Sequence, residues 1–157
     1  MAGILPISLD KNGNLLFLFG KEYFLNNEGW SDFGGSKEKN ETPYATAIRE
    51  GWEESAGFLG SKADIKKLVK NHKKARIKSR TYTTYIVKIP YDHKLPKAFR
   101  NNYLYIKKNT PILIYQHNGL YEKDKLMWLP LHKLKSKINR FRPWYKEIIK
   151  LIIKEFN

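Results

Sequence analysis

The segment from residue 42 to residue 58 constrains the fold of this chain most, because it specifies one helix with two chemically different faces. Thr42 and Pro43 form a strong helix start, since threonine can cap free amides and proline is tolerated in the first turn. Gly57 is expected to stop the helix. Apolar side chains at intervals of three and four predict a face packed on the core. They are Ala45, Ile48 and Trp52.

Three glutamates occupy another face of the same helix. Glu50, Glu53 and Glu54 stand at i, i+3 and i+4, so one turn presents three carboxylates. Like charges this close repel each other unless cations neutralise them, and hard oxygen ligands at this density suit Mg²⁺ or Mn²⁺. A solvated acidic face is the alternative explanation, and it would be preferred if these three residues stood alone.

The flanking residues favour the metal site, because they complete a long motif of fixed spacing. The run 35–58 resembles the Nudix box, which reads Gly, five residues, Glu, seven residues, Arg-Glu, a bulky apolar residue, any residue, Glu-Glu, any residue, Gly and an apolar residue. Two positions depart from it, since Gly51 takes the bulky apolar place and the closing glycine, Gly57, comes one residue late. The matching residues are Gly35, Glu41, Arg49, Glu50, Glu53 and Glu54.

The resemblance implies a role for each residue near the three glutamates. Glu53 and Glu54 correspond to the principal metal ligands, and Glu50 corresponds to a further ligand or to the base that activates water. Arg49 corresponds to the arginine that orients these glutamates, and its i, i+4 spacing from Glu53 suits that role. Gly35 corresponds to the loop glycine whose backbone approaches the metal.

Other acids are candidates for auxiliary roles. Glu41, inside the box, is expected to be a structural or auxiliary acid. Many members of the family add an acid from outside the box, and the candidates here are Glu122 and Asp124, just before a predicted strand at 126–130. Ordinary turn residues are the alternative explanation for both.

The family resemblance also implies a fold and a reaction. The fold is an α/β/α sandwich around a mixed β-sheet, and a length of 157 residues suits a single domain over residues 1–157. The reaction is hydrolysis of a pyrophosphate bond with Mg²⁺ or Mn²⁺ as cofactor, generally in a nucleoside diphosphate linked to another moiety. We therefore expect a metal-dependent Nudix pyrophosphohydrolase.

Local patterns predict further elements around the box. An Asn-Gly pair at 12–13 between apolar runs at 3–8 and 15–19 indicates a β-hairpin. Ser61 with Asp64 resembles a capping box and predicts a short second helix. The other expected elements are an extended piece at 23–25, strands at 81–89, 110–116 and 126–130, a C-terminal helix at about 143–156, and an unassigned interval at 92–108 that is a candidate insertion.

The charge of the chain points to polyanionic partners. Thirty Lys and Arg against fifteen Asp and Glu leave a formal charge of +15. Basic residues are densest at 61–80, where nine stand against a single acid, and a second basic stretch covers 133–142. A general solubility charge is the alternative explanation. The residues expected to contact RNA or phosphate are Lys66, Lys67, Lys70, Lys73, Lys74, Arg76, Lys78 and Arg80.

Capped RNA is the favoured substrate on these grounds, and hydrolysis of its 5′ cap would release a methylated guanosine diphosphate (m7GDP) and a 5′-monophosphate RNA. The chain also resembles Nudix proteins of large DNA viruses, several of which are mRNA decapping enzymes. Trp30, Tyr23 or Phe24 could stack on a cap base. The alternatives are a diphosphoinositol polyphosphate, a nucleoside diphosphate derivative or nucleoside triphosphate, and a non-catalytic RNA-binding role.

Residue types and segments that the sequence lacks exclude several kinds of functional site. The sequence has no cysteine, which excludes disulfides, thiolate zinc sites and cysteine nucleophiles. Its four histidines stand at no metal-binding interval, and no apolar run approaches the roughly 18 residues of a membrane span. We expect a cytoplasmic protein without a membrane span or a disulfide partner, located in the host cytoplasm if the protein is viral.

Overall fold

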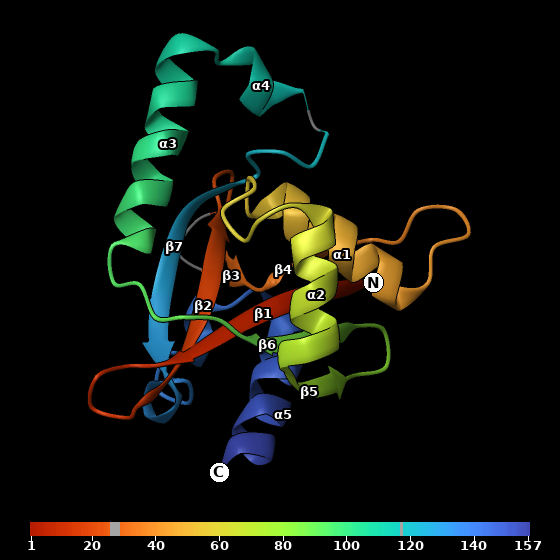
Figure 1. Cartoon of the computed structure of the whole chain (residues 1–157), viewed down its shortest axis with the longest axis vertical. Helices are drawn as coiled ribbons and strands as arrows, with labels where there is room; N and C mark the ends of the chain where they lie inside the picture. The colour runs from red at the N-terminus through yellow and green to blue at the C-terminus, as the bar shows by residue number, and fades with distance from the viewer. Residues whose placement is uncertain (26–28, 117) are drawn as a thin grey trace.

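A mixed β-sheet forms the centre of the computed structural model, which describes residues 1–25, 29–116 and 118–157 (Figure 1). The strand β1 (Ala2–Leu9) pairs antiparallel with β2 (Leu15–Glu22) and parallel with β6 (Thr83–Lys88). This pairing confirms the mixed sheet expected from the sequence. The other strands are β3 (Trp30–Ser31) and β7 (Lys123–Pro130), which pair with β2, β4 (Phe33–Gly35), which pairs with β1, and β5 (Lys73–Lys78), which pairs with β6.

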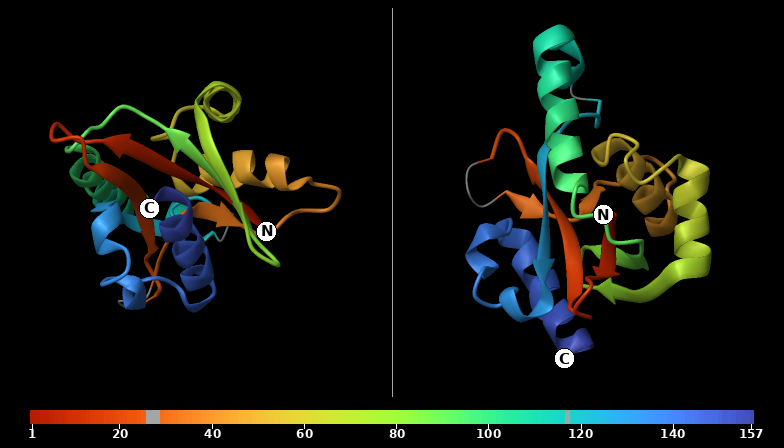
Figure 2. Two further views of the ribbon diagram at one scale, coloured as in Figure 1. Left: turned by 90° about the horizontal axis from the view of Figure 1, so that it is seen from below. Right: turned by 60° about the vertical axis from the view of Figure 1, so that its left-hand side comes forward.

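Helices cover both faces of this sheet, as Figure 2 shows for α2 and α5. The helices are α1 (Pro43–Glu54), α2 (Lys62–His72), α3 (Leu95–Asn109), α4 (Ile112–Tyr115) and α5 (Lys146–Phe156). Side chains alternate along β1, so that Leu5 and Ile7 pack with α5, while Ala2 and Ile4 pack with α1 and α2. The predicted α/β architecture with helices on both faces is therefore confirmed. Among the described helices, none combines the length and hydropathy needed to cross a membrane.

Helix α1 begins and ends where the sequence predicts. The Thr42 hydroxyl accepts a hydrogen bond from the Ala45 amide at 3.1 Å and caps the first turn. The last helical residue is Glu54, and the chain leaves the helix through Ala56 and Gly57, whose φ values of 49° and 76° both lie in the left-handed region. Ala56, at the closing-glycine position of the motif, therefore already takes the left-handed conformation that ends the helix, and Gly57 continues it.

The face that α1 turns toward the sheet differs from the expected one. Ala45 is exposed and Trp52 is only half-buried, whereas Ile48 is buried as predicted. Gly51 is also buried, and a Cβ at this position would lie 2.9 Å from Cγ1 of Ile4. Since the missing side chain lets α1 approach β1 closely, a glycine occupies the bulky apolar position of the motif for a steric reason.

Several other predicted elements are confirmed. The β1–β2 hairpin turns through Gly13, whose φ is 79°. The Ser61 hydroxyl and the Asp64 carboxylate form the reciprocal capping box that starts α2. Strand β6 lies within the predicted strand at 81–89, and β7 contains the predicted strand at 126–130. The predicted C-terminal helix at 143–156 corresponds to a 3-10 turn at Pro143–Tyr145 followed by α5.

Two predicted extended segments are wrong. Residues 23–25 form a turn after β2. Residues 112–115 form the short helix α4 instead of a strand, because Pro111, with a φ of −61°, suits the start of a helical turn. The β-rich composition of this segment therefore did not decide its local structure.

The elements that lay outside the sequence predictions include α3 and β5 as well as the short strands β3 and β4. The unassigned interval 92–108 contains α3, which buries Phe99 and Tyr103 one turn apart. The basic segment 61–80 contains β5, an edge strand in which Ile77 is buried while the lysines around it are exposed. Because this edge strand has a single buried apolar residue, its sequence lacks the apolar alternation by which a strand is predicted, and only its positive charge is evident.

We predict that Gly51→Leu destabilises the protein, although it restores the apolar residue of the motif. The added side chain would meet the buried Ile4 and push α1 away from β1, at a cost of about 1–3 kcal/mol in the free energy of unfolding. Urea unfolding measures this change. Ala45→Leu, on an exposed position of the same helix, is the matched control, and equal stabilities of the two variants would contradict the steric explanation.

Candidate active site

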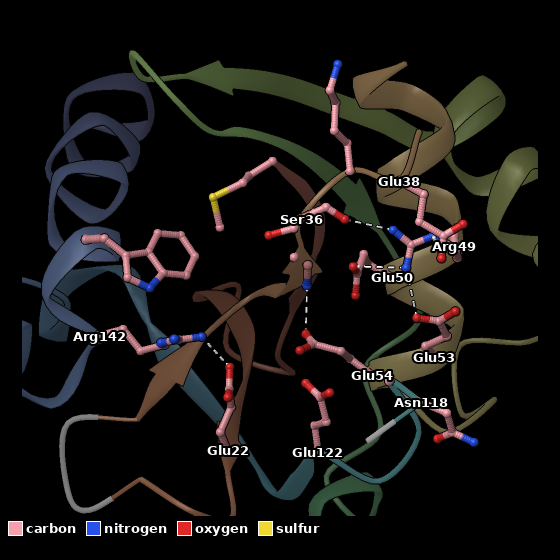
Figure 3. Close-up of a pocket in the computed structure, with 16 residues that line it drawn as sticks. Glu22, Ser36, Glu38, Arg49, Glu50, Glu53, Glu54, Asn118, Glu122 and Arg142 are labelled. Atoms are coloured by element: carbon pink, nitrogen blue, oxygen red, sulfur yellow. Dashed lines mark hydrogen bonds and ion pairs between the residues drawn. The ribbon is translucent and has the colours of Figure 1, made fainter. Parts of the chain in front are cut away.

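A cavity of about 550 Å³ opens between α1, the turn after β4 and the segment that precedes α5 (Figure 3). Its volume lies in the range of small-molecule sites. The structure brings Gly35 and the predicted box residues of α1 into this cavity. The described lining consists of Met1, Glu22, Gly34, Gly35, Ser36, Lys37, Glu38, Arg49, Glu50, Glu53, Glu54, Asn118, Gly119, Glu122, Arg142 and Trp144.

Arg49 organises the acidic wall of the cavity. Its Nη1 donates to Oε1 of Glu50 and to Oε2 of Glu53, each at 3.0 Å. Its Nε and Nη2 donate to the two carboxylate oxygens of Glu41 at 2.8 and 3.1 Å. Nη2 also donates to the carbonyl of Ser36 at 2.8 Å. The guanidinium therefore makes the predicted i, i+4 contact with Glu53 and joins α1 to the loop before it.

Glu54 is the most deeply buried glutamate of this wall. Its Oε2 accepts a hydrogen bond from the Gly34 amide at 2.7 Å and lies 3.4 Å from Nζ of Lys123. Lys123 has no exposed surface, and its Nζ also donates to Oγ of Ser31 at 3.0 Å. The lysine stem passes Gly20, where any Cβ would overlap its Cδ. Two opposite charges thus neutralise each other at the base of the cavity.

The double glycine after β4 lets the backbone reach the acidic wall. A Cβ on Gly35 would lie 2.6 Å from Oε1 of Glu50, so a side chain here would displace that carboxylate. Asp32, directly before β4, ties the start of this strand to the start of β6. Its carboxylate accepts hydrogen bonds from the Tyr82 hydroxyl at 2.6 Å and the Thr84 hydroxyl at 2.5 Å. Burial raises the pKa of Asp32 to about 6, against the opposing effect of these two donors.

The pKa values of all three glutamates on α1 are raised above their ordinary value. Burial raises the pKa of Glu50 to about 7, while the nearby Arg49 opposes the shift and Glu53 adds to it. Burial also raises the pKa of Glu53, and it raises the pKa of Glu54 well above its ordinary value despite the neighbouring Lys123. Because each shift reflects a carboxylate that is costly to ionise, the wall favours the binding of additional positive charge.

The acidic wall fits a divalent cation by its donor chemistry. Its oxygen donors are carboxylates, which Mg²⁺ and Mn²⁺ prefer. In the part of the chain that the structure describes, no three acidic or histidine side chains converge on one point, and Arg49 and Lys123 hold the glutamates instead. An incoming ion would therefore compete with these two internal cations. Of the four histidines considered as metal ligands in the sequence, His117 lies outside the described residues.

Only some of the auxiliary acids reach the cavity. Glu122 lines it and contributes to the raised pKa of Glu50. Asp124 instead accepts a hydrogen bond from Nη1 of Arg100, on α3, at 2.7 Å and is absent from the described lining. Glu41 lies behind Arg49, which lowers the pKa of Glu41 to about 2 by hydrogen bonding. Glu41 therefore holds the guanidinium of Arg49 in position through two hydrogen bonds.

Sequence reasoning missed several residues near the site, and four of them make charged or aromatic contacts far from the box. Glu22, buried at the end of β2, forms an ion pair with Arg142. Lys123 neutralises Glu54 from β7, and Trp144 lines the cavity beside Arg142. The only signal in the sequence was the basic stretch 133–142, which contains Arg142, because the contacts join strands and loops that are far apart in the chain.

Other residues with a predicted substrate role lie elsewhere. The eight basic residues lie on α2, on β5 and in the turn after β5, and the described lining of the cavity contains none of them. Of the three aromatic residues expected to stack on a base, Trp30 is buried in the core with 6% exposure. Neither Tyr23 nor Phe24 belongs to the described lining.

The raised pKa of Glu50 predicts a pH dependence of stability. The folded protein holds a proton up to about pH 7 that the unfolded chain releases near pH 4.5, so the free energy of unfolding of the metal-free protein should fall as the pH rises through this window. Glu50→Gln should flatten the fall, as measured by urea unfolding at several pH values. Glu155→Gln, on the exposed side of α5, is the control. If both variants kept the same slope as the parent protein, Glu50 would not hold this proton.

Comparison with known proteins identifies the fold. No protein-family model matches the sequence, and no curated protein matches it. Among solved structures, a Nudix hydrolase from M. smegmatis is 16% identical with a TM-score of 0.51, over 99% of this chain and 86% of that one. An Ap4A hydrolase from C. elegans is 14% identical with a TM-score of 0.52, over 95% of this chain and 90% of that one.

A larger protein contains a similar unit. The bifunctional NMN adenylyltransferase/ADP ribose pyrophosphatase from Francisella tularensis, solved with AMP and a manganese ion, is 15% identical with a TM-score of 0.55. The match covers 98% of this chain but only 41% of that protein. Identities this low establish shape alone, and by that measure the chain has the fold of the Nudix hydrolases.

Proposed function

We propose that this protein is a Mg²⁺- or Mn²⁺-dependent Nudix pyrophosphohydrolase. The observation that carries the proposal is that Glu50, Glu53 and Glu54 all line one cavity beside the Gly34–Gly35 turn. Carboxylates with raised pKa values in a cleft are typical of catalytic sites. The Nudix fold and the box motif support the same reaction class.

Each residue of the wall has a proposed task. Glu53 and Glu54 would be the principal metal ligands, and Glu50, with a pKa near 7, would be a further ligand or the general base. The bound ion would supply neutralisation of the phosphate oxygens and a water of lowered pKa. Arg49 would hold Glu50 and Glu53 in place, and the missing side chain of Gly35 would leave room for the phosphate chain. Glu122 is the proposed auxiliary acid.

We predict that Glu53→Gln and Glu54→Gln each abolish metal-dependent turnover, because the amide removes a charged ligand while keeping the shape of the side chain. The measurement is phosphate or nucleotide release with Mg²⁺ or Mn²⁺ present, alongside binding of the substrate. Binding should be largely retained. Glu155→Gln on α5 is the matched control. Undiminished Mg²⁺-dependent turnover in both variants would refute the metal-ligand assignment.

For the substrate, we propose capped mRNA, hydrolysed to m7GDP and a 5′-monophosphate RNA. The net charge of +15 and the exposed lysines of α2 support it, because phosphate contacts give affinity for RNA without sequence specificity. A cytoplasmic location, which is the host cytoplasm for a viral protein, would match this substrate. The complete set of box glutamates disfavours a non-catalytic RNA-binding domain.

A free nucleotide derivative is the second candidate. Two of the similar solved structures are named an Ap4A hydrolase and an ADP ribose pyrophosphatase, and neither name requires an extended basic surface. A diphosphoinositol polyphosphate is the third candidate, because clustered lysines would also attract it. Hydrolysis of cap-labelled RNA, a diphosphoinositol phosphate and free nucleotides, compared side by side, separates the three.

We predict that the double variant Lys66→Glu, Lys70→Glu weakens the reaction with capped RNA selectively. The KM for capped RNA should rise by about tenfold or more and depend less steeply on salt, while the KM for a free cap dinucleotide stays unchanged. Lys107→Glu, Lys108→Glu on the exposed end of α3 is the charge-matched control. Equal effects on RNA and on the dinucleotide would contradict an RNA-binding role for α2.

A further inference from the structure

The cavity has a second wall that the Nudix box does not supply. Arg142 and Trp144 line it, and both belong to the segment before α5. In Figure 3, Arg142 lies across the cavity from Glu50 and Glu53. The cavity therefore faces carboxylates on one side and a planar cation with an indole on the other.

This second wall is firmly held. The Arg142 amide donates to the carbonyl of Trp30 at 3.0 Å, and its guanidinium forms an ion pair with Glu22. The central carbon of that guanidinium lies 5.1 Å from the centroid of the Trp144 indole. The indole is backed by the buried ring of Tyr82 at a centroid distance of 4.9 Å. Trp144 is half-buried and lines the cavity beside Arg142, so the surface that this wall offers to a flat ligand consists of the guanidinium over the indole and the uncovered part of the indole itself.

The chemistry of the two walls divides a ligand into two parts. The acidic wall repels phosphate unless a metal ion intervenes, and the carboxylate of Glu122, which also lines the cavity, adds to this repulsion. The indole carries no charge, and flat rings of nucleobases stack on tryptophan and on arginine planes. A ligand with a pyrophosphate at one end and a base at the other fits both walls. An inositol polyphosphate, which is anionic on all sides and has no aromatic ring, does not.

We propose that Arg142 and Trp144 form a nucleobase subsite, so that the ligand of this cavity is a nucleoside diphosphate derivative, whether free or at the end of a capped RNA. Placing the phosphate chain against Glu50, Glu53 and Glu54 rests on the proposed hydrolase function, whereas binding of the base to Trp144 does not. The subsite replaces the three aromatic residues expected from the sequence, of which Trp30 lies in the core.

Equilibrium binding tests the subsite without turnover. Guanosine 5′-(α,β-methylene)diphosphate, methylenediphosphonate and inositol hexakisphosphate are titrated by calorimetry, with Mg²⁺ present, into the parent protein, Trp144→Ala, Trp144→Phe and the surface control Tyr105→Ala. We expect Trp144→Ala to weaken the nucleotide about tenfold or more. Trp144→Phe should recover most of the affinity, and Tyr105→Ala, whose ring is 65% exposed on α3, should match the parent protein. The diphosphonate, which has no base, should bind all four proteins equally.

Three outcomes would overturn the subsite. They are undiminished nucleotide binding by Trp144→Ala, a parallel loss of the diphosphonate and the nucleotide, and displacement of the nucleotide from the parent protein by inositol hexakisphosphate. Competition is the readout for the last ligand, because the exposed lysines outside the cavity can also bind it. The Trp144→Phe variant separates the loss of a stacking surface from the loss of packing against Tyr82. Failure of the hydrolase proposal has a different signature, since the parent protein would then hydrolyse none of the three substrate classes while its binding of the nucleotide still depended on Trp144.

Discussion

The pairing of Glu54 with Lys123 is the interaction on which the rest of the site depends. Both side chains are almost completely buried, and a buried charge is tolerated only when a partner and hydrogen bonds offset its desolvation. The Gly34 amide and the Ser31 hydroxyl supply those hydrogen bonds. The contact joins α1 to β4 and β7, so the acidic face of the helix is fixed against the sheet before any ligand arrives.

Small residues make this arrangement possible at two points. Gly20 leaves the space through which the stem of Lys123 reaches the base of the cavity, and Gly51 lets α1 approach β1 closely enough to bring its carboxylates there. A bulky residue at Gly20 would displace Lys123, and one at Gly51 would displace α1 with Glu54, so either would separate this ion pair. The departure of Gly51 from the motif is thus part of how this chain builds the site.

The sequence predicted what is encoded locally and failed where distant segments meet. Glu50, Glu53 and Arg49 were predictable because helical spacing alone brings them together. Lys123, Arg142 and Trp144 were not, because β7 and the segment before α5 reach the cavity only through the fold. The choice between Glu122 and Asp124 had the same limit, since residues two apart share a face of a regular strand. The register shift of β7 against β2, between the pairs Lys21–Lys125 and Glu22–Lys123, interrupts that regularity and is not evident in the sequence. The helix α4 was missed because its Ile-Leu-Ile-Tyr composition favours a strand.

Charge is distributed in two opposing layers. The chain as a whole carries +15, and exposed lysines lie on α2 and β5 among other places, whereas most of the carboxylates that line the cavity are buried or half-buried. The outer field attracts a polyanion from a distance, because potentials of like sign add over the surface. Inside the cavity the same polyanion meets repulsion that only bound cations remove. In the proposed hydrolase, attraction and reaction would therefore occur at separate places, and a bound metal ion would decide whether a phosphate chain can enter the cavity.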